Sequence, residues 1–73
     1  MKNEALIQAI ALCATARVLI ARNHNFVCRA DADEVDVVAI LTEYGIAYTE
    51  ENYAALRGAV IDALDAHNAI LSA

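Results

Sequence analysis

The stretch ALIQAIALCATARVLIA, residues 5–21, constrains the fold most, because its only polar side chains are Gln8, Thr15 and Arg17. Such a run forms a membrane span, the core helix of a folded domain, or a helix that buries two faces. It is short for a bilayer, which takes about 20 residues, and an arginine at the centre of a span costs about 2.5 kcal/mol or more. Glu4 is also untypical of the basic start of a signal peptide. We therefore expect a core or interface helix and no membrane segment.

The remaining composition indicates one small helical domain. The 73 residues include no proline and two glycines, and 60% of them are hydrophobic, which is typical of a folded chain. A domain of this size buries too little surface to be more than marginally stable alone. The two cysteines lack the dense spacing of a disulfide scaffold, so we expect free thiols and a cytoplasmic location. We predict an all-α fold over residues 1–73: a small three-helix bundle in long, short, long order, completed by homo-oligomerisation.

Capping signals mark the ends of the helices. Gly45 fits the left-handed position that follows a helix end, and Thr49 fits the N-cap of the next helix. Tyr48 and Tyr53 are spaced to pack across that helix start as a hydrophobic staple. The predicted helices span about residues 3–22, 32–44 and 50–71.

Local propensity in the segment of the short helix is mixed. Asp31 or Asp33 is the expected start, because carboxylates favour the first turn of a helix. The segment EVDVVAIL, residues 34–41, is rich in β-branched residues, so a strand remains an alternative there.

The helical period predicts a core-facing stripe on each long helix. In the first helix Arg17 lies near the centre of this stripe. Its stem is expected to pack there, and its guanidinium either to pair with a carboxylate of the acidic half or to reach solvent at the helix end. The stripe of the first helix comprises Leu6, Ile7, Ile10, Cys13, Ala14, Val18, Ile20 and Ala21. The stripe of the third helix comprises Tyr53, Leu56, Val60, Leu64, His67 and Leu71.

The first helix also carries large apolar residues on its opposite side. Leu12 and Leu19 are seven residues apart and fall nearly opposite the core stripe. Small neighbours would let another helix approach closely, with the two leucines as knobs. We therefore predict an interface between chains that comprises Ala5, Ala9, Leu12, Ala16 and Leu19.

Charge is distributed unevenly along the chain, whose net charge is −5. Residues 1–30 hold four cationic side chains against Glu4, whereas residues 31–73 hold only Arg57 against nine carboxylates. This polarity favours antiparallel or head-to-tail pairing of the two parts, within one chain or between chains. The acidic balance argues against direct binding of nucleic acid.

No residue pattern predicts catalysis, a metal site or a cofactor. Cys28 and His24 have ligand-like spacing, but a structural zinc site needs four ligands. His67 is expected to be a hydrogen-bonded packing residue. Arginine suits phosphate binding, so an anion or phosphate site is predicted from Arg17, Arg22, His24 and Arg29.

A second group of residues has the composition of a binding surface. Tyr44, Tyr48 and Arg57 are of the types that dominate interface energetics, and we expect them to contribute to an interface.

The predicted function is therefore binding and not catalysis: an adaptor or inhibitor of a larger cytoplasmic protein, self-associating through its first helix. One alternative is an oligomeric binder of a small phosphorylated ligand or nucleotide, with an arginine-lined pocket between subunits. Another is an acidic nucleic-acid mimic that occupies a basic partner.

Overall fold

Two long helices, α1 (Lys2–Ala21) and α3 (Glu50–Ser72), form the body of the protein. A 3₁₀ helix, η1 (Arg29–Glu34), and a short helix, α2 (Val37–Glu43), lie between them in the chain. The structure is a computed structural model that describes residues 2–73, and the side chains of residues 4–73. The described residues contain no strand, so the fold is all-α and the strand alternative for residues 34–41 is wrong.

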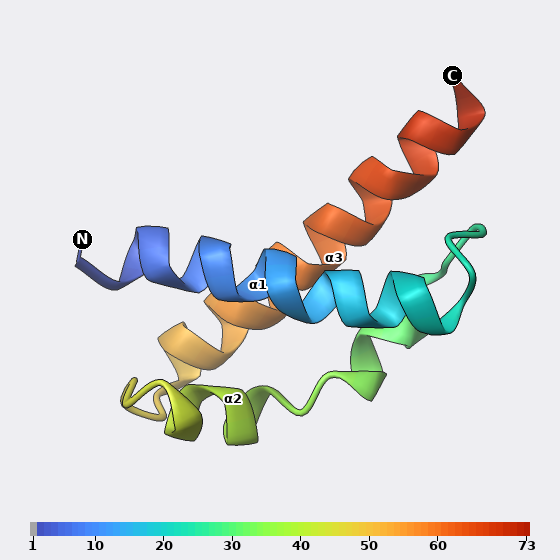
Figure 1. Cartoon of the computed structure of the whole chain (residues 1–73). Helices are drawn as coiled ribbons and strands as arrows, with labels where there is room; N and C mark the ends of the chain where they lie inside the picture. The colour runs from blue at the N-terminus through green and yellow to red at the C-terminus, as the bar shows by residue number, and fades with distance from the viewer. Residues whose placement is uncertain (1) are drawn as a thin grey trace.

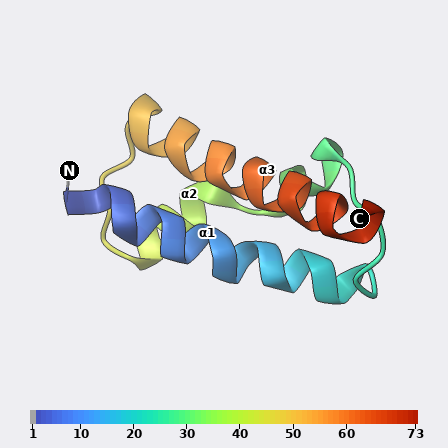
Figure 2. The same cartoon turned by 90° about the horizontal axis from the view of Figure 1, so that it is seen from above.

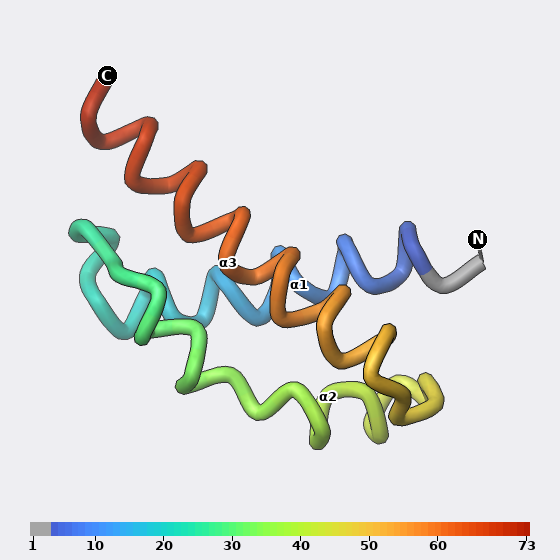
Figure 3. Tube along the Cα trace, turned by 180° about the vertical axis from the view of Figure 1, so that it is seen from behind, coloured from blue at the N-terminus to red at the C-terminus, as the bar shows by residue number. Residues whose placement is uncertain are grey.

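The long helices run in the same general direction and lie side by side (Figure 2), crossing at an angle (Figure 1). Because α1 and α3 run in the same direction, the chain between them has to return from the end of α1 to the level of its start. Residues 22–49 make this return along one side of the pair, and η1 and α2 are its helical parts (Figure 3).

The core lies where these elements meet. Its largest fully buried side chains come from α2 and α3: Leu41, Leu56, Val60 and Leu64. On α3 the predicted stripe is therefore confirmed at its centre but wrong at its ends, where Tyr53 and Leu71 are exposed. The C-terminal end of α3 projects beyond the other helices (Figure 1), and Leu71 near that end is 40% exposed.

The predicted core stripe of α1 is only partly correct. The buried face of α1 is centred on small residues, Ala11 and Ala14, which allow α3 to approach closely. Thr15 is buried, whereas Arg17 is exposed, contrary to the prediction. Four predicted core residues are also exposed: Leu6, Cys13, Ile20 and Ala21. The buried face of α1 comprises Ile7, Ile10, Ala11, Ala14, Thr15 and Val18.

The predicted signals around Gly45 are confirmed. Gly45 has φ +69°, and its N–H donates to the Thr42 carbonyl at 3.1 Å. The Ile46 N–H donates to the Leu41 carbonyl at 2.9 Å, which completes a Schellman motif whose two apolar residues both join the core.

The start of α3 also follows prediction. The Thr49 hydroxyl accepts a hydrogen bond from the Asn52 N–H at 3.0 Å. The rings of Tyr48 and Tyr53 meet edge to face, with centroids 6.2 Å apart, as a hydrophobic staple requires.

The short helix begins later than predicted. Residues 32–44 do not form one helix, because residues 29–34 are η1 and Asp36 is the N-cap of α2, accepting from the Ala39 N–H at 3.1 Å. Asp31 instead accepts a hydrogen bond from the Cys28 N–H at 2.8 Å. The segment DADEVD, residues 31–36, offers several aspartates that could serve as an N-cap. Extended backbone at Val35 separates η1 from α2.

Candidate functional site

The side of α1 that faces away from the core is an uninterrupted apolar surface. Leu12 and Ile20 are each 64% exposed there. Within residues 4–21 the exposed polar side chains are Glu4, Gln8 and Arg17, and at about 100° per residue all three fall outside this surface. We name it the outer face: Ala5, Leu6, Ala9, Leu12, Cys13, Ala16 and Ile20.

The predicted interface residues of α1 are spaced as in a coiled coil. Ala5, Ala9, Leu12, Ala16 and Leu19 follow one another at alternating intervals of four and three residues. The first four are exposed and belong to the outer face, while Leu19 is half-buried and packs against the core at its edge. The structure thus leaves most of this seam open to a second helix.

The composition of α1 also meets the requirement for a membrane span. Glu4–Ala21 has a mean hydropathy of 1.7, and by length and composition alone it is the one described helix able to cross a bilayer. The core helix of a soluble protein and a signal sequence share these properties. Only 33% of the segment is buried by the rest of the chain. α1 therefore has more apolar surface than its packing within the chain buries.

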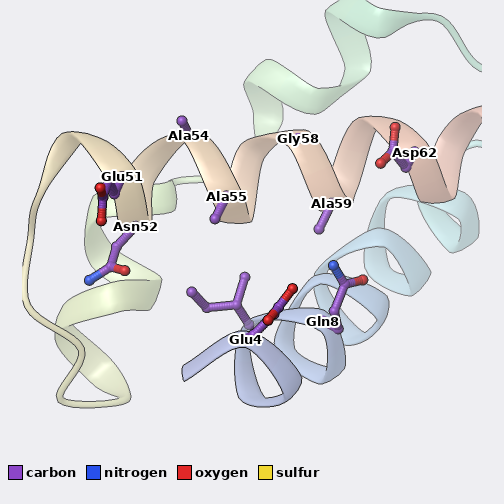
Figure 4. A pocket seen from close by; sticks show the side chains of 10 residues that line it. Glu4, Gln8, Glu51, Asn52, Ala54, Ala55, Gly58, Ala59 and Asp62 are labelled. Carbon is purple, nitrogen blue, oxygen red and sulfur yellow. The ribbon is translucent and has the colours of Figure 1, made fainter. Parts of the chain in front are cut away.

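A groove of about 530 Å³ lies beside the outer face, between the N-terminal halves of α1 and α3. Glu4 and Gln8 of α1 and Ala55 and Ala59 of α3 point into it (Figure 4). Its apolar residues are small apart from Ile7, and three carboxylates contribute to its lining. The lining comprises Glu4, Ile7, Gln8, Glu51, Asn52, Ala54, Ala55, Gly58, Ala59 and Asp62.

Arg22 belongs to an ion-pair cluster within the chain. Its Nε and Nη2 donate to Asp31 Oδ1 at 3.2 and 3.1 Å, and Nη2 also donates to the Glu34 carboxylate. These hydrogen bonds, to Glu34 and then to Asp31, raise the pKa of Arg22. The Cys28 N–H is the main cause, and Arg22 the second, of a lowered pKa at the Asp31 carboxyl. The guanidinium is thus already occupied by two carboxylates.

The other predicted ligand residues do not gather around Arg22. Arg17 lines a separate groove of about 270 Å³ together with Glu34, Asp36 and Glu43, and none of the other three predicted ligand residues lines it. His24 lies at the end of α1 with φ +58°, and Arg29 is exposed at the start of η1. The carboxylates beside Arg17 oppose an anionic ligand.

His67 is a hydrogen-bonded packing residue, as predicted. Its Nε2 lies 3.1 Å from the His24 carbonyl oxygen and 3.2 Å from that of Asn25. The rings of His24 and His67 are 6.4 Å apart. Both side chains therefore secure the turn that follows α1.

The remaining predicted interface residues lie apart from the outer face. Tyr44 and Tyr48 are exposed near the turn between α2 and α3. Arg57 is half-buried and pairs with Asp33, with Nη1 2.8 Å from Oδ1. Arg57 therefore fixes η1 against α3 within the chain.

Sequence reasoning missed the groove and the place of Gly58 in its lining. A glycine in the middle of an otherwise regular helix pattern, Gly58, was the available signal. Among the described residues, no group of three or more His, Cys, Asp or Glu side chains is placed to hold a metal ion. Comparisons with protein families, curated proteins and solved structures find no match for this chain.

Proposed function

We propose that this protein is a non-enzymatic interaction module that self-associates through the outer face of α1 and acts as an adaptor or inhibitor of a larger cytoplasmic protein. The observation that carries the proposal is the outer face itself, whose exposed side chains are all apolar. Scattered apolar residues are normal on a protein surface, but a continuous apolar helix face marks an interface.

The surface area of the chain supports the same conclusion. The chain exposes 4840 Å², whereas a compact monomer of its mass, 7.8 kDa, exposes about 4,400 Å². Fully burying a leucine or isoleucine side chain contributes about 1.5–3 kcal/mol. In a pair of chains, Leu12 and Ile20 would each contribute twice. A second copy would in this way complete the small three-helix bundle.

The spacing of the outer face favours a helix as the covering partner. Knobs-into-holes packing requires apolar residues at alternating intervals of four and three, and α1 offers them from Ala5 to Leu19. A lipid surface needs no such spacing, so we propose a second copy of the chain as the partner of this face.

Sedimentation equilibrium tests self-association directly. The wild type should form a dimer or larger oligomer at micromolar concentration, and Leu12→Glu with Ile20→Glu should be monomeric and still helical by circular dichroism. Ile70→Glu is the matched control, because Ile70 is 74% exposed on α3 and is not part of the outer face. A monomeric wild type overturns the proposal, and flotation of that monomer with liposomes would assign the face to lipid.

Thiol labelling gives a second test within the wild-type chain. Cys13 and Cys28 are both exposed, but only Cys13 lies on the outer face. Self-association should slow the reaction of Cys13 with Ellman's reagent and leave Cys28 reactive. Leu12→Glu with Ile20→Glu should restore the rate of Cys13, whereas equal rates for both thiols in the wild type would contradict the proposed interface.

The two alternative functions have weaker support. A pocket for a phosphorylated ligand needs free arginines, but Arg22 is held by Asp31 and Glu34, and Arg17 lies among carboxylates. An acidic mimic of nucleic acid is favoured only by the carboxylates near the groove. Thermal stabilisation by a panel of nucleotides would revive the first alternative.

A further inference from the structure

We infer that the groove between α1 and α3 receives a helix of the partner protein, and that this helix has an apolar face of small residues flanked by lysine or arginine. The inference rests on the proposed function and assigns the site and the chemistry of the larger partner. It involves a different surface from the outer face, so the two are separable by experiment.

The shape of the groove suits a helix with small side chains. Between the two helices its apolar lining consists of Ile7, three alanines and one glycine. Ala55 and Ala59 point into the space from α3, facing Gln8 of α1 (Figure 4). Small residues at a helix surface let another backbone approach closely.

Gly58 has no role within the folded chain that explains it. A glycine in a helix interior costs about 1 kcal/mol relative to alanine. Gly58 has ordinary helical backbone, and a Cβ added there would meet no atom within 4 Å. Neither backbone conformation nor internal packing therefore requires glycine. Close approach of a backbone from outside the chain would require it.

The charge of the groove defines the partner further. Glu51 and Asp62 line the groove, and neither forms an ion pair with any residue that the structure describes. Among the lining residues that the structure describes there is no lysine or arginine, and the described ion pairs of Arg22 and Arg57 are made with η1. Like charges in one groove raise the local negative potential, which a cationic partner would relieve.

The distance between the carboxylates favours a helix over a small organic cation. Glu51 and Asp62 are eleven residues apart on α3, which corresponds to about 16 Å along the helix axis. That span is about three helical turns. Lysines or arginines along one edge of a partner helix would reach both carboxylates, while a compact cation would reach one.

A labelled single-helix peptide is the probe, with alanine on one face and lysine on both flanks. Fluorescence anisotropy should show binding that weakens as salt increases. The same peptide with glutamate in place of lysine should bind at least about tenfold more weakly, since opposed rim charges strongly change association. Equal binding of the two peptides, or no binding of the lysine peptide, overturns the inference.

Variants locate the binding within the groove. Gly58→Phe should place a ring at the edge of the groove on α3 and abolish binding, and Asp62→Lys should weaken binding by about tenfold. Asp65→Lys is the matched control, because Asp65 is exposed on the same helix but does not line the groove. A wild-type affinity in Gly58→Phe, with wild-type helicity, would overturn the assignment.

Sedimentation of the same variants separates the two proposals. Gly58→Phe should remain self-associated while losing the peptide, and Leu12→Glu with Ile20→Glu should be monomeric while retaining it. If the wild type is monomeric but binds the lysine peptide through Gly58 and Asp62, self-association fails and the groove assignment stands.

Discussion

Asn68 and Val27 form two reciprocal hydrogen bonds between α3 and the segment that follows α1. The Val27 N–H donates to Asn68 Oδ1 at 3.0 Å, and Asn68 Nδ2 donates to the Val27 carbonyl at 2.6 Å. The side-chain amide of Asn68 thus supplies hydrogen-bond partners to both the N–H and the carbonyl of the buried Val27. A neighbouring strand would otherwise supply such partners.

Asn68→Leu should therefore destabilise the protein by about 1–3 kcal/mol, because it leaves two backbone groups of Val27 without partners. Urea denaturation measures the loss, and hydrogen exchange should speed up at the Val27 amide. Asn52→Leu is the control, because the Asn52 side chain donates to the carbonyl of Ala47, which is exposed. This variant should lose less stability than Asn68→Leu. Similar losses in both variants would contradict the role given to Asn68.

The Asp31 carboxylate makes stability depend on acid pH. Its folded pKa is lowered by the Cys28 N–H and by Arg22, so folded Asp31 binds its proton less tightly than unfolded Asp31 does. Its contribution is fully present above the unfolded pKa, about 3.9, and is lost as pH falls through the lower folded pKa.

Asp31→Asn should flatten the fall in the urea midpoint between about pH 5 and pH 2.5. Arg22→Gln should reproduce part of this effect, since Arg22 is the secondary cause of the lowered pKa. The loss of stability in the double variant should be smaller than the sum of the losses in the two single variants, because both residues belong to one network. An unchanged acid slope in Asp31→Asn would show that the carboxylate does not couple folding to protons.

Local chemistry in the sequence was sufficient to predict the start of α3 and the end of α2. Gly45, Thr49 and the pair Tyr48 and Tyr53 each act within a few residues, so their roles do not depend on the rest of the fold. The start of α2 was not predictable in this way, because several nearby aspartates have the chemistry of an N-cap. In the structure Asp36 caps α2, while Asp31 accepts from the Cys28 N–H and from Arg22.

The orientation of α1 could not be predicted from periodicity. Apolar residues surround most of this helix, so no direction is favoured until α3 packs against Ala11 and Ala14. The exposure of Leu12 was nevertheless predicted, because it lies opposite any stripe that contains Ile10. The groove depends on Glu4 and Glu51 being brought together across the chain, which a single sequence does not reveal.

The two glycines should respond to alanine with opposite signs. Gly45→Ala should destabilise by about 1 kcal/mol, because alanine is strained at φ +69°. Gly58→Ala should stabilise by up to about 1 kcal/mol, because the added methyl group meets open space in a helix interior. Urea denaturation at fixed protein concentration measures both. A loss of stability in Gly58→Ala would mean that the fold itself requires this glycine.

Thr15 should be a site where removal of a polar group stabilises the protein. Its side chain faces the core at 3% exposure, and its buried hydroxyl has no hydrogen-bond partner. A buried, unpaired hydroxyl costs about 1–3 kcal/mol, and valine has nearly the same shape without it. Thr15→Val should therefore raise the free energy of unfolding by about 1 kcal/mol, whereas Thr15→Ser, which keeps the hydroxyl and loses a methyl group, should lower it by a similar amount. If Thr15→Val were instead the less stable variant, the hydroxyl would have to donate a hydrogen bond in solution, for which the carbonyl of Ala11, one turn earlier on α1, is the nearest chemical option.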